Sequence, residues 1–109
     1  MPSQTECAYL AGLVDGEGCI QLNRIRLWNR ARTKWRWRYK LTLQISMCAQ
    51  PTLVWAARIF GGKVTARPMP KDKPHYRQQW VWIVAEAAAE RVIREIRPYL
   101  HNKFSETEV

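Results

Sequence analysis

Residues 34–46 read KWRWRYKLTLQIS, and polar and apolar side chains alternate through the whole stretch. Strict alternation is typical of a β-strand, because successive side chains point to opposite faces of a sheet. Extended to Met47, the predicted strand would be about 46 Å long, which is more than one turn of B-DNA, ~34 Å. Its polar face would carry Lys34, Arg36, Arg38, Lys40, Thr42, Gln44 and Ser46.

The rest of the chain shows helical and strand periodicities in a regular order. The predicted elements are a helix over 5–16, strands over 19–28 and 34–47, a helix over 50–60, strands over 63–67 and 77–84, and a helix over 85–100. Ser3 or Thr5 is the expected N-cap of the first helix, and Pro98 is expected to end or kink the last. This αββαββα order predicts one α+β domain over 1–109, with helices on one face of a four-stranded antiparallel sheet.

Charge is distributed unevenly along the 109 residues. The net charge is +9, and fourteen of the eighteen Lys and Arg lie between Cys19 and Ala85 with a single acid, Asp72. Because the acids lie on the predicted helices, the uncovered face of the sheet should be positive, which favours nucleic acid or an anionic membrane as the partner. A solvated face whose Lys and Arg protect against aggregation is the alternative. The mixture of long cations with shorter polar residues favours phosphate and base contacts.

The register of the first hairpin needs an irregularity. Pairing the strands across their loop would place Ile25 opposite Trp37, but the apolar phase of the first strand slips between Leu22 and Ile25. A β-bulge near Asn23 or Arg24 would correct the slip. The basic face would then also carry Gln21, Asn23, Arg24 and Arg26.

Several residue types predict packing rather than chemistry. Trp35 and Trp37 are interpreted as core or cross-strand packing residues, not base-stacking platforms. The strand over 77–84 is apolar at both odd and even positions, so either Trp80 and Trp82 or Val81 and Ile83 face the core. The three cysteines lack metal-ligand spacing and predict small apolar thiols in a reducing, intracellular compartment. Neither a secretory signal nor a membrane span is expected.

The first predicted helix carries the most specific pattern. Ala8, Gly12 and Gly16 recur every four residues and would let a second backbone approach closely, although each helical glycine costs ~1 kcal/mol. Two acids, Asp15 and Glu17, follow. Cleavage of phosphodiesters with two metals needs at least two carboxylates, and two copies of this chain would bring both Glu17 side chains together.

The stretch LAGLVDGEG, residues 10–18, resembles the LAGLIDADG motif of homing endonucleases at nearly every position. IFGGKV over 59–64 and RPYLHNK over 97–103 resemble two further landmarks of that family. The element order is also similar over essentially the whole chain. The resemblance implies a single-motif homodimer that holds a long, near-palindromic DNA duplex between two saddle-shaped sheets. It also implies cleavage of both strands across the minor groove, with 3′ overhangs.

The resemblance assigns roles residue by residue. Glu17 and the Gly16 carbonyl would hold Mg²⁺ or Mn²⁺, and Lys103 would lie near the scissile phosphate. Asp15 would have a more structural role at the end of the interface helix. The expected dimer interface comprises Ala8, Ala11, Gly12, Asp15 and Gly16.

One position departs from the family pattern. Met47 occupies the end of the second strand, where some relatives have a polar residue that positions water, so Gln44 or Gln50 is the expected substitute, with Gln44 assigned as catalytic. Double-stranded DNA is the expected partner, with no membrane and no small-molecule cofactor beyond the metal. The predicted DNA-binding residues are Gln21, Asn23, Arg24, Arg26, Arg30, Lys34, Arg36, Arg38, Lys40, Thr42, Gln44, Ser46, Lys63, Thr65, Arg67, Arg77 and Gln79.

Two other functional classes fit parts of the sequence. An intron-RNA maturase or a DNA-binding regulator could use the same fold without cleavage. Glu17 and Lys103 together favour the nuclease, because a protein that only binds has no need of an acid facing phosphate. A small basic structural protein would leave the glycine stripe unexplained.

Overall fold

The computed structural model describes residues 2–28, 34–69, 71–72 and 77–101. The elements are α1 (Gln4–Glu17), β1 (Gly18–Trp28), β2 (Trp35–Met47), α2 (Gln50–Phe60), β3 (Lys63–Ala66), β4 (Trp80–Ala85), α3 (Glu86–Ile96) and a short 3₁₀ turn, η1 (Arg97–Tyr99). The predicted α+β class and αββαββα order are confirmed, and the single antiparallel sheet has the strand order β1-β2-β4-β3. Within the described residues, no helix is long and apolar enough to cross a membrane.

Local signals account for the helix boundaries. Ser3 caps α1 in a capping box, in which its hydroxyl accepts a hydrogen bond from the Glu6 amide and the Glu6 carboxylate accepts one from the Ser3 amide. α2 begins with Pro51 in its first turn and ends at Gly61, as predicted. α3 gives way to η1 just before Pro98, where a proline breaks the helical hydrogen bonds.

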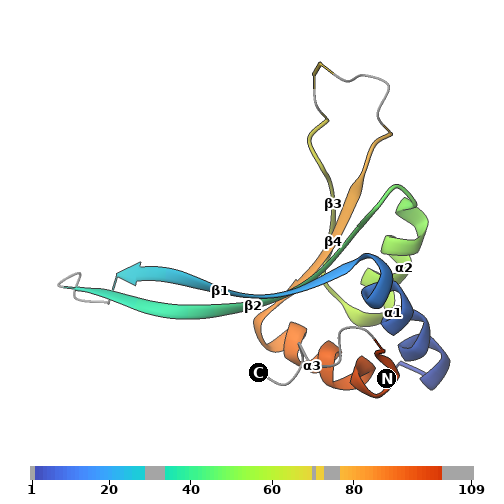
Figure 1. Cartoon of the computed structure of the whole chain (residues 1–109), viewed down its shortest axis with the longest axis horizontal. Coiled ribbons are helices and arrows are strands. Elements are labelled where there is room, and N and C mark those ends of the chain that lie inside the picture. Colours follow the sequence, from blue (N-terminus) through green and yellow to red (C-terminus); the bar gives the residue numbers. More distant parts are fainter. Residues whose placement is uncertain (1, 29–33, 70, 73–76, 102–109) are drawn as a thin grey trace.

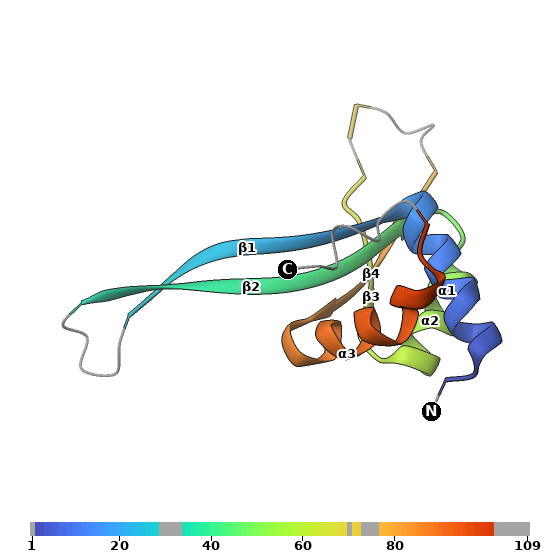
Figure 2. The same cartoon turned by 60° about the horizontal axis from the view of Figure 1, so that its bottom comes forward.

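One face of the sheet is covered by the helices and the other is open. Leu43 and Ile45 on β2 and Trp82 and Val84 on β4 are buried, while α1 and α3 pack against β2 and α2 packs against β4. This burial decides which residues of β4 face the core: Trp82 does and Ile83 does not. Figure 1 shows that the β1–β2 hairpin extends far beyond the three helices, and Figure 2 shows the same projection from a second direction.

The predicted β-bulge is wrong. Every residue of β1 pairs in sequence with one of β2, from Gly18 opposite Ile45 to Trp28 opposite Trp35, without an inserted residue. This register is one residue away from the predicted one and places Gln21 opposite Thr42. Polar and apolar residues of the inner hairpin therefore match without a bulge. The consequence is that Arg24 and Arg26 share a face with Tyr39 and Trp37, not with Gln21.

The turn after α2 depends on glycine. Gly61 and Gly62 have φ of +87° and +97°, and a Cβ on Gly62 would lie 2.5 Å from Val84 Cγ1 and 2.6 Å from the Ile83 carbonyl oxygen. The same turn holds the largest core side chain, because Trp82 Nε1 donates a hydrogen bond to the Gly61 carbonyl at 2.8 Å. Backbone geometry thus favours glycine at both positions, and packing against β4 requires it at Gly62.

We expect Gly62→Ala to lower the free energy of unfolding by about 2 kcal/mol or more, because the methyl group meets backbone atoms in a conformation that alanine disfavours. Urea denaturation followed by tryptophan fluorescence measures the change. Gly61→Ala is the matched control, since its φ is also positive but a Cβ there would approach only Arg91 Nη2, at 3.7 Å. Equal stabilities of the two variants would contradict the assigned role of Gly62.

Candidate nucleic-acid interface

The open face is the side of the sheet away from the helices. Residues opposite one another in an antiparallel pair point to the same side, so the register defines this face without ambiguity. Its described members are Cys19, Gln21 and Asn23 on β1; Arg38, Lys40, Thr42, Gln44 and Ser46 on β2; Lys63 and Thr65 on β3; and Val81 and Ile83 on β4. Most of the predicted DNA-binding residues therefore lie on one surface.

The character of the open face changes from its outer arm to its centre. The outer arm has cations, Arg38 and Lys40, with Lys63 at the opposite edge, and the centre has shorter polar groups such as Gln44 and Ser46. Asn23 Nδ2 donates a hydrogen bond to Gln21 Oε1 at 3.5 Å. Long cations suit phosphates and amide groups suit base edges, so the gradient matches the two kinds of DNA contact.

The short β3–β4 arm extends the open face. The Arg67 amide donates to the Gln79 carbonyl at 2.9 Å, which continues the β3–β4 register beyond the strands themselves. Gln78 Nε2 donates to the Arg67 and Gln79 carbonyls at 2.7 and 2.8 Å and holds this end together. Arg67, Arg77 and Gln79 are all exposed. They keep their predicted place as candidate DNA contacts.

Two predicted contacts have a different position. Thr42 is only 5% exposed, because its short side chain lies between β1 and β4 neighbours and longer residues on the same strand. It offers little surface to a base edge. Arg24 lies on the reverse face of the hairpin, where its guanidinium stacks over the Trp37 ring at 3.8 Å.

The remaining predicted contacts are only partly described. Arg26 is on the same reverse face as Arg24, and Lys34 is exposed just before β2. Arg36 pairs with Leu27 through the backbone of the hairpin. Arg30 and Lys103 lie outside the described residues. Trp37 is 57% exposed, so its predicted cross-strand contact is found but not a place in the core.

Glu17 ends α1 at the point where β1 begins. It is exposed, and the next residue, Gly18, pairs with Ile45 at the inner end of the hairpin. An acid at a helix C-terminus faces the negative end of the helix dipole, and the last turn of α1 contains no basic residue. Among the described residues no ion pair involves Glu17. Its placement is therefore unfavourable for the helix alone and available to a cation.

Asp15 joins the two ends of the chain. Its Oδ2 accepts a hydrogen bond from the His101 amide at 2.8 Å. This contact fixes the segment that follows η1 against the end of α1, two residues before Glu17. No sequence signal pointed to His101 as the partner of Asp15, and the role of Asp15 in the interface stays a prediction.

Other candidate catalytic positions are separated by the sheet. Gln44 is half-buried on the open face, where its neighbours across the strands are Cys19 and Ile83. Met47 packs against the core, and Gln50 is the first residue of α2. Of the two glutamines, Gln44 is the one on the open face.

The glycine stripe of α1 lies on its outer surface. Ala8, Gly12 and Gly16 are exposed, and a Cβ on either glycine would meet nothing within 4 Å. Packing within one protomer therefore does not require these glycines. Ala11 was predicted to belong to the dimer interface as well. That prediction is wrong, because Ala11 is fully buried among the core residues of its own chain.

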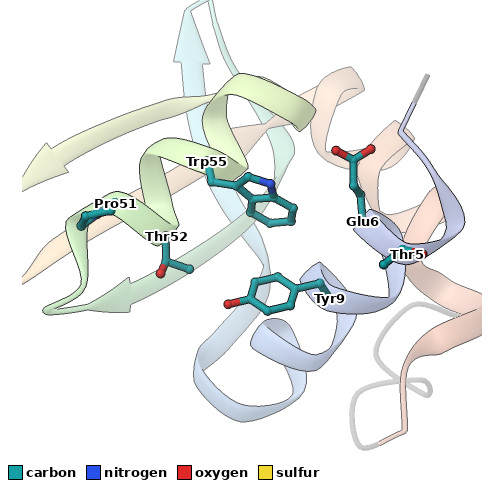
Figure 3. A pocket seen from close by; sticks show the side chains of 6 residues that line it. All are labelled: Thr5, Glu6, Tyr9, Pro51, Thr52 and Trp55. Atoms are coloured by element: carbon teal, nitrogen blue, oxygen red, sulfur yellow. The ribbon is translucent and has the colours of Figure 1, made fainter.

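A shallow pocket lies between α1 and α2, away from the open face. It has a volume of about 480 Å³, and Thr5, Glu6, Tyr9, Pro51, Thr52 and Trp55 line it. Figure 3 shows Tyr9 and Trp55 facing each other across it, with ring centroids 5.1 Å apart in an edge-to-face arrangement. The pocket belongs to the helical side, and neither Glu17 nor Gln44 is among its lining residues.

Of the three thiols, Cys7 is buried as a packing residue should be, whereas Cys19 is half-buried and Cys48 is exposed. Burial, then the charges of Glu95 and Glu6, raise the pKa of the Cys7 thiol. Cys7 therefore stays protonated at neutral pH and is unsuited to be a nucleophile or a metal ligand. The described residues hold no group of three or more His, Cys, Asp and Glu side chains arranged for a metal ion.

Comparison with solved structures defines the class of fold. The chain has the fold of the LAGLIDADG homing endonucleases. The homing endonuclease I-CvuI, solved in complex with its target in the presence of Ca²⁺, superposes with a TM-score of 0.73 at 20% identity. The superposition covers 96% of this chain and 62% of I-CvuI, so the chain spans less than two thirds of that protein's length.

Two further structures extend the likeness. The archaeal intron-encoded homing endonuclease I-Vdi141I, complexed with DNA, has a TM-score of 0.66 at 12% identity over 94% of this chain and 62% of its own. The LAGLIDADG meganuclease I-AabMI, bound to uncleaved DNA, has a TM-score of 0.63 at 18% identity over 94% and 33%. No protein-family model and no curated protein sequence matches the chain.

Proposed function

We propose that the chain is a homodimeric, site-specific endonuclease that hydrolyses both strands of a long, near-palindromic DNA duplex with a divalent metal ion. One observation carries the proposal: the exposed Glu17 carboxylate lies at the junction of α1 and β1, beside the basic open face. An acid at that place would repel a bound phosphate unless a cation lay between them. The shared fold supports the same conclusion.

The residues present fit Mg²⁺ or Mn²⁺. Mg²⁺ in nucleic-acid enzymes is held by one or two carboxylates together with waters and substrate phosphates, so a dedicated cluster of protein ligands is not required. Glu17 and the Gly16 carbonyl would hold the ion. When bound, it would neutralise developing charge on the phosphate and activate water. Gln44 would orient that water, and Lys103 would stabilise charge on the scissile phosphate.

The homodimer follows from the number of carboxylates and from α1. One protomer supplies Glu17 once, and cutting two strands requires two sites. Gly12 and Gly16 leave open space on the outer surface of α1, where a second α1 could pack backbone to backbone. A two-fold axis through this stripe would bring the two Glu17 side chains together and set the two open faces side by side on one duplex.

The proposal is tested with purified protein, a randomised duplex library and Mg²⁺, followed by sequencing of the ends formed. Site-specific double-strand cuts with 3′ overhangs are expected, and chelation by EDTA should abolish them. Binding of many sequences without any cut would contradict the nuclease assignment. Tight binding to a structured RNA in preference to duplex DNA would contradict it as well.

The register makes a separate prediction about binding. We expect Lys40→Gln, on the open face, to reduce the slope of log K against log [salt] by about 0.9 per protomer, the effect of losing one phosphate contact. Arg24→Gln removes an equal charge from the reverse face and should leave the slope nearly unchanged. Fluorescence anisotropy of a labelled duplex at several salt concentrations measures both. Equal losses in the two variants would show that the reverse face also contacts DNA.

A further inference from the structure

An acidic side chain reaches the basic face of the sheet. Arg38 Nη2 on the outer part of β2 donates to Glu86 Oε1 at the start of α3, forming an ion pair between residues 48 positions apart in the chain. The side chains are 52% and 40% exposed. A second ion pair, Arg94 with Glu90, joins neighbours on α3 and is remote from β2 in sequence. Arg38 is thus a candidate DNA contact whose guanidinium is already paired with a carboxylate.

The chain path explains how Glu86 reaches Arg38. β4 pairs with β2 only as far as Ala85, which lies opposite Thr42. From Leu41 toward the tip of the hairpin, β2 therefore pairs with β1 along one edge only. α3 begins beside this free edge (Figure 1). Its first residue, Glu86, therefore emerges next to the cationic stretch of β2.

The backbone at Glu86 is unusual. Its φ is +59°, the only positive value of a non-glycine residue among those described. A left-handed conformation is unfavourable for a residue with a Cβ, and glycine or asparagine is the usual occupant. An acid in the first turn of a helix is favourable to the dipole, but that does not explain a side chain directed at Arg38. An exposed ion pair also adds little to stability.

The composition of this region sharpens the point. From Cys19 to Ala85 the chain has fourteen basic residues and one acid, and Glu86 is the first acid that follows. A carboxylate on this surface opposes DNA binding by its charge. A role in selecting among DNA sequences accounts for its presence there.

We propose that Glu86 is a specificity-determining residue that acts through Arg38, neutralising its guanidinium and holding it back from phosphates. A guanidinium has five N–H donors, and the hydrogen bond to Glu86 uses the Nη2 group. The remaining donors stay available to a base edge, whereas a phosphate must displace or approach a carboxylate. Binding to arbitrary sequences is thereby weakened more than binding to the target. The proposal rests on the proposed function.

The test compares Glu86→Gln with Glu90→Gln. Both raise the net charge by one and both lie on α3, but only the first releases Arg38. For a random duplex, Glu86→Gln should steepen the slope of log K against log [salt] by about 0.9 per protomer. Relative to wild type, its affinity should then rise about eightfold per protomer, or about sixtyfold for a dimer, as salt falls from 1 M to 0.1 M, and Glu90→Gln should change the slope much less.

Two further variants separate the carboxylate from other effects. Glu86→Gly accepts the left-handed φ without a Cβ and should show the same steeper slope, which keeps the test independent of how glutamine fits the site. In an Arg38→Gln background, Glu86→Gln should give no added slope, because the residue through which it acts is gone. The ratio of target to random affinity should fall in Glu86→Gln and recover in Glu86→Asp.

The outcomes distinguish this inference from the proposed function. If Glu86→Gln and Glu90→Gln behave alike while wild type binds duplex DNA, the role of Glu86 is overturned and DNA binding stands. The role of Glu86 is also overturned if the effect of Glu86→Gln persists in the Arg38→Gln background. The change in overall charge, and not the release of Arg38, would then be responsible. Absence of salt-dependent duplex binding by wild type overturns both.

Discussion

Glu17→Gln is expected to abolish DNA cleavage and leave DNA binding intact. The substitution keeps the size of the side chain but removes the charge that would hold the metal ion, and loss of several kcal/mol of metal-assisted stabilisation corresponds to a rate at least on the order of 10³ lower. The fold should tolerate the change, because Glu17 is exposed and an acid at a helix C-terminus is unfavourable. Single-turnover cleavage of a selected target measures the loss.

The control for Glu17→Gln is Glu90→Gln, which removes an exposed acid from the outer surface of α3. Its cleavage rate should stay within a factor of about two of wild type, because screening weakens long-range effects of exposed charges. Binding of both variants is followed by anisotropy in Ca²⁺. Wild-type rates in Glu17→Gln would remove this residue from the active site.

Gly12→Leu should convert a dimer into a folded monomer. A leucine side chain on the outer surface of α1 meets open space within its own protomer, but it would separate two helices packed backbone to backbone. Sedimentation velocity at micromolar concentration should show a dimer for wild type and a monomer for the variant. Cleavage should be lost with the dimer, because each target needs two copies of Glu17.

Gly12→Ala provides the matched control for folding. Alanine is favoured over glycine in a helix by ~1 kcal/mol. When the protein is monomeric, Gly12→Ala should therefore raise its free energy of unfolding by up to that amount. Circular dichroism should show native helix content in both variants. A wild-type protein that stays monomeric at micromolar concentration would refute the interface.

Local rules predicted the helices and the order of the elements along the chain well. The capping box at Ser3, the glycine pair at Gly61 and Gly62, and Pro98 are short-range signals, and the helix boundaries follow them closely. The strict alternation of β2 likewise predicted its two faces, with Leu43 and Ile45 inside. These features depend on neighbours in sequence, which periodicity reads directly.

Features that depend on distant partners were harder to predict. The hairpin register differs by one residue from the prediction, because the prediction was counted outward from the loop, whereas the inner pairs match polar and apolar residues only in the observed alignment. That single step moved Arg24 and Arg26 to the reverse face. The predictions for Thr42 and Ala11 were wrong for a related reason. Alternation and helical spacing indicate which face of a strand or helix a residue lies on, but its burial depends on the side chains that pack around it.

The contacts around the candidate site had still weaker signals. Glu86 could have been noticed as the first acid after a long basic segment, but its approach to Arg38 depends on where β4 leaves β2. The stacking of Arg24 on Trp37 followed only from the register. Asp15 lies 86 residues from His101, a separation that no periodicity reports.

The hydrogen bond between Asp15 and the His101 amide also bears on the timing of folding. α1 packs against α3 and η1, so α1 leaves the ribosome before the later elements that complete its packing. Contacts of such long sequence separation form late. A nascent chain would therefore carry its basic hairpin before the end of α1 is fixed, and the proposed nuclease activity would require that synthesis has passed His101.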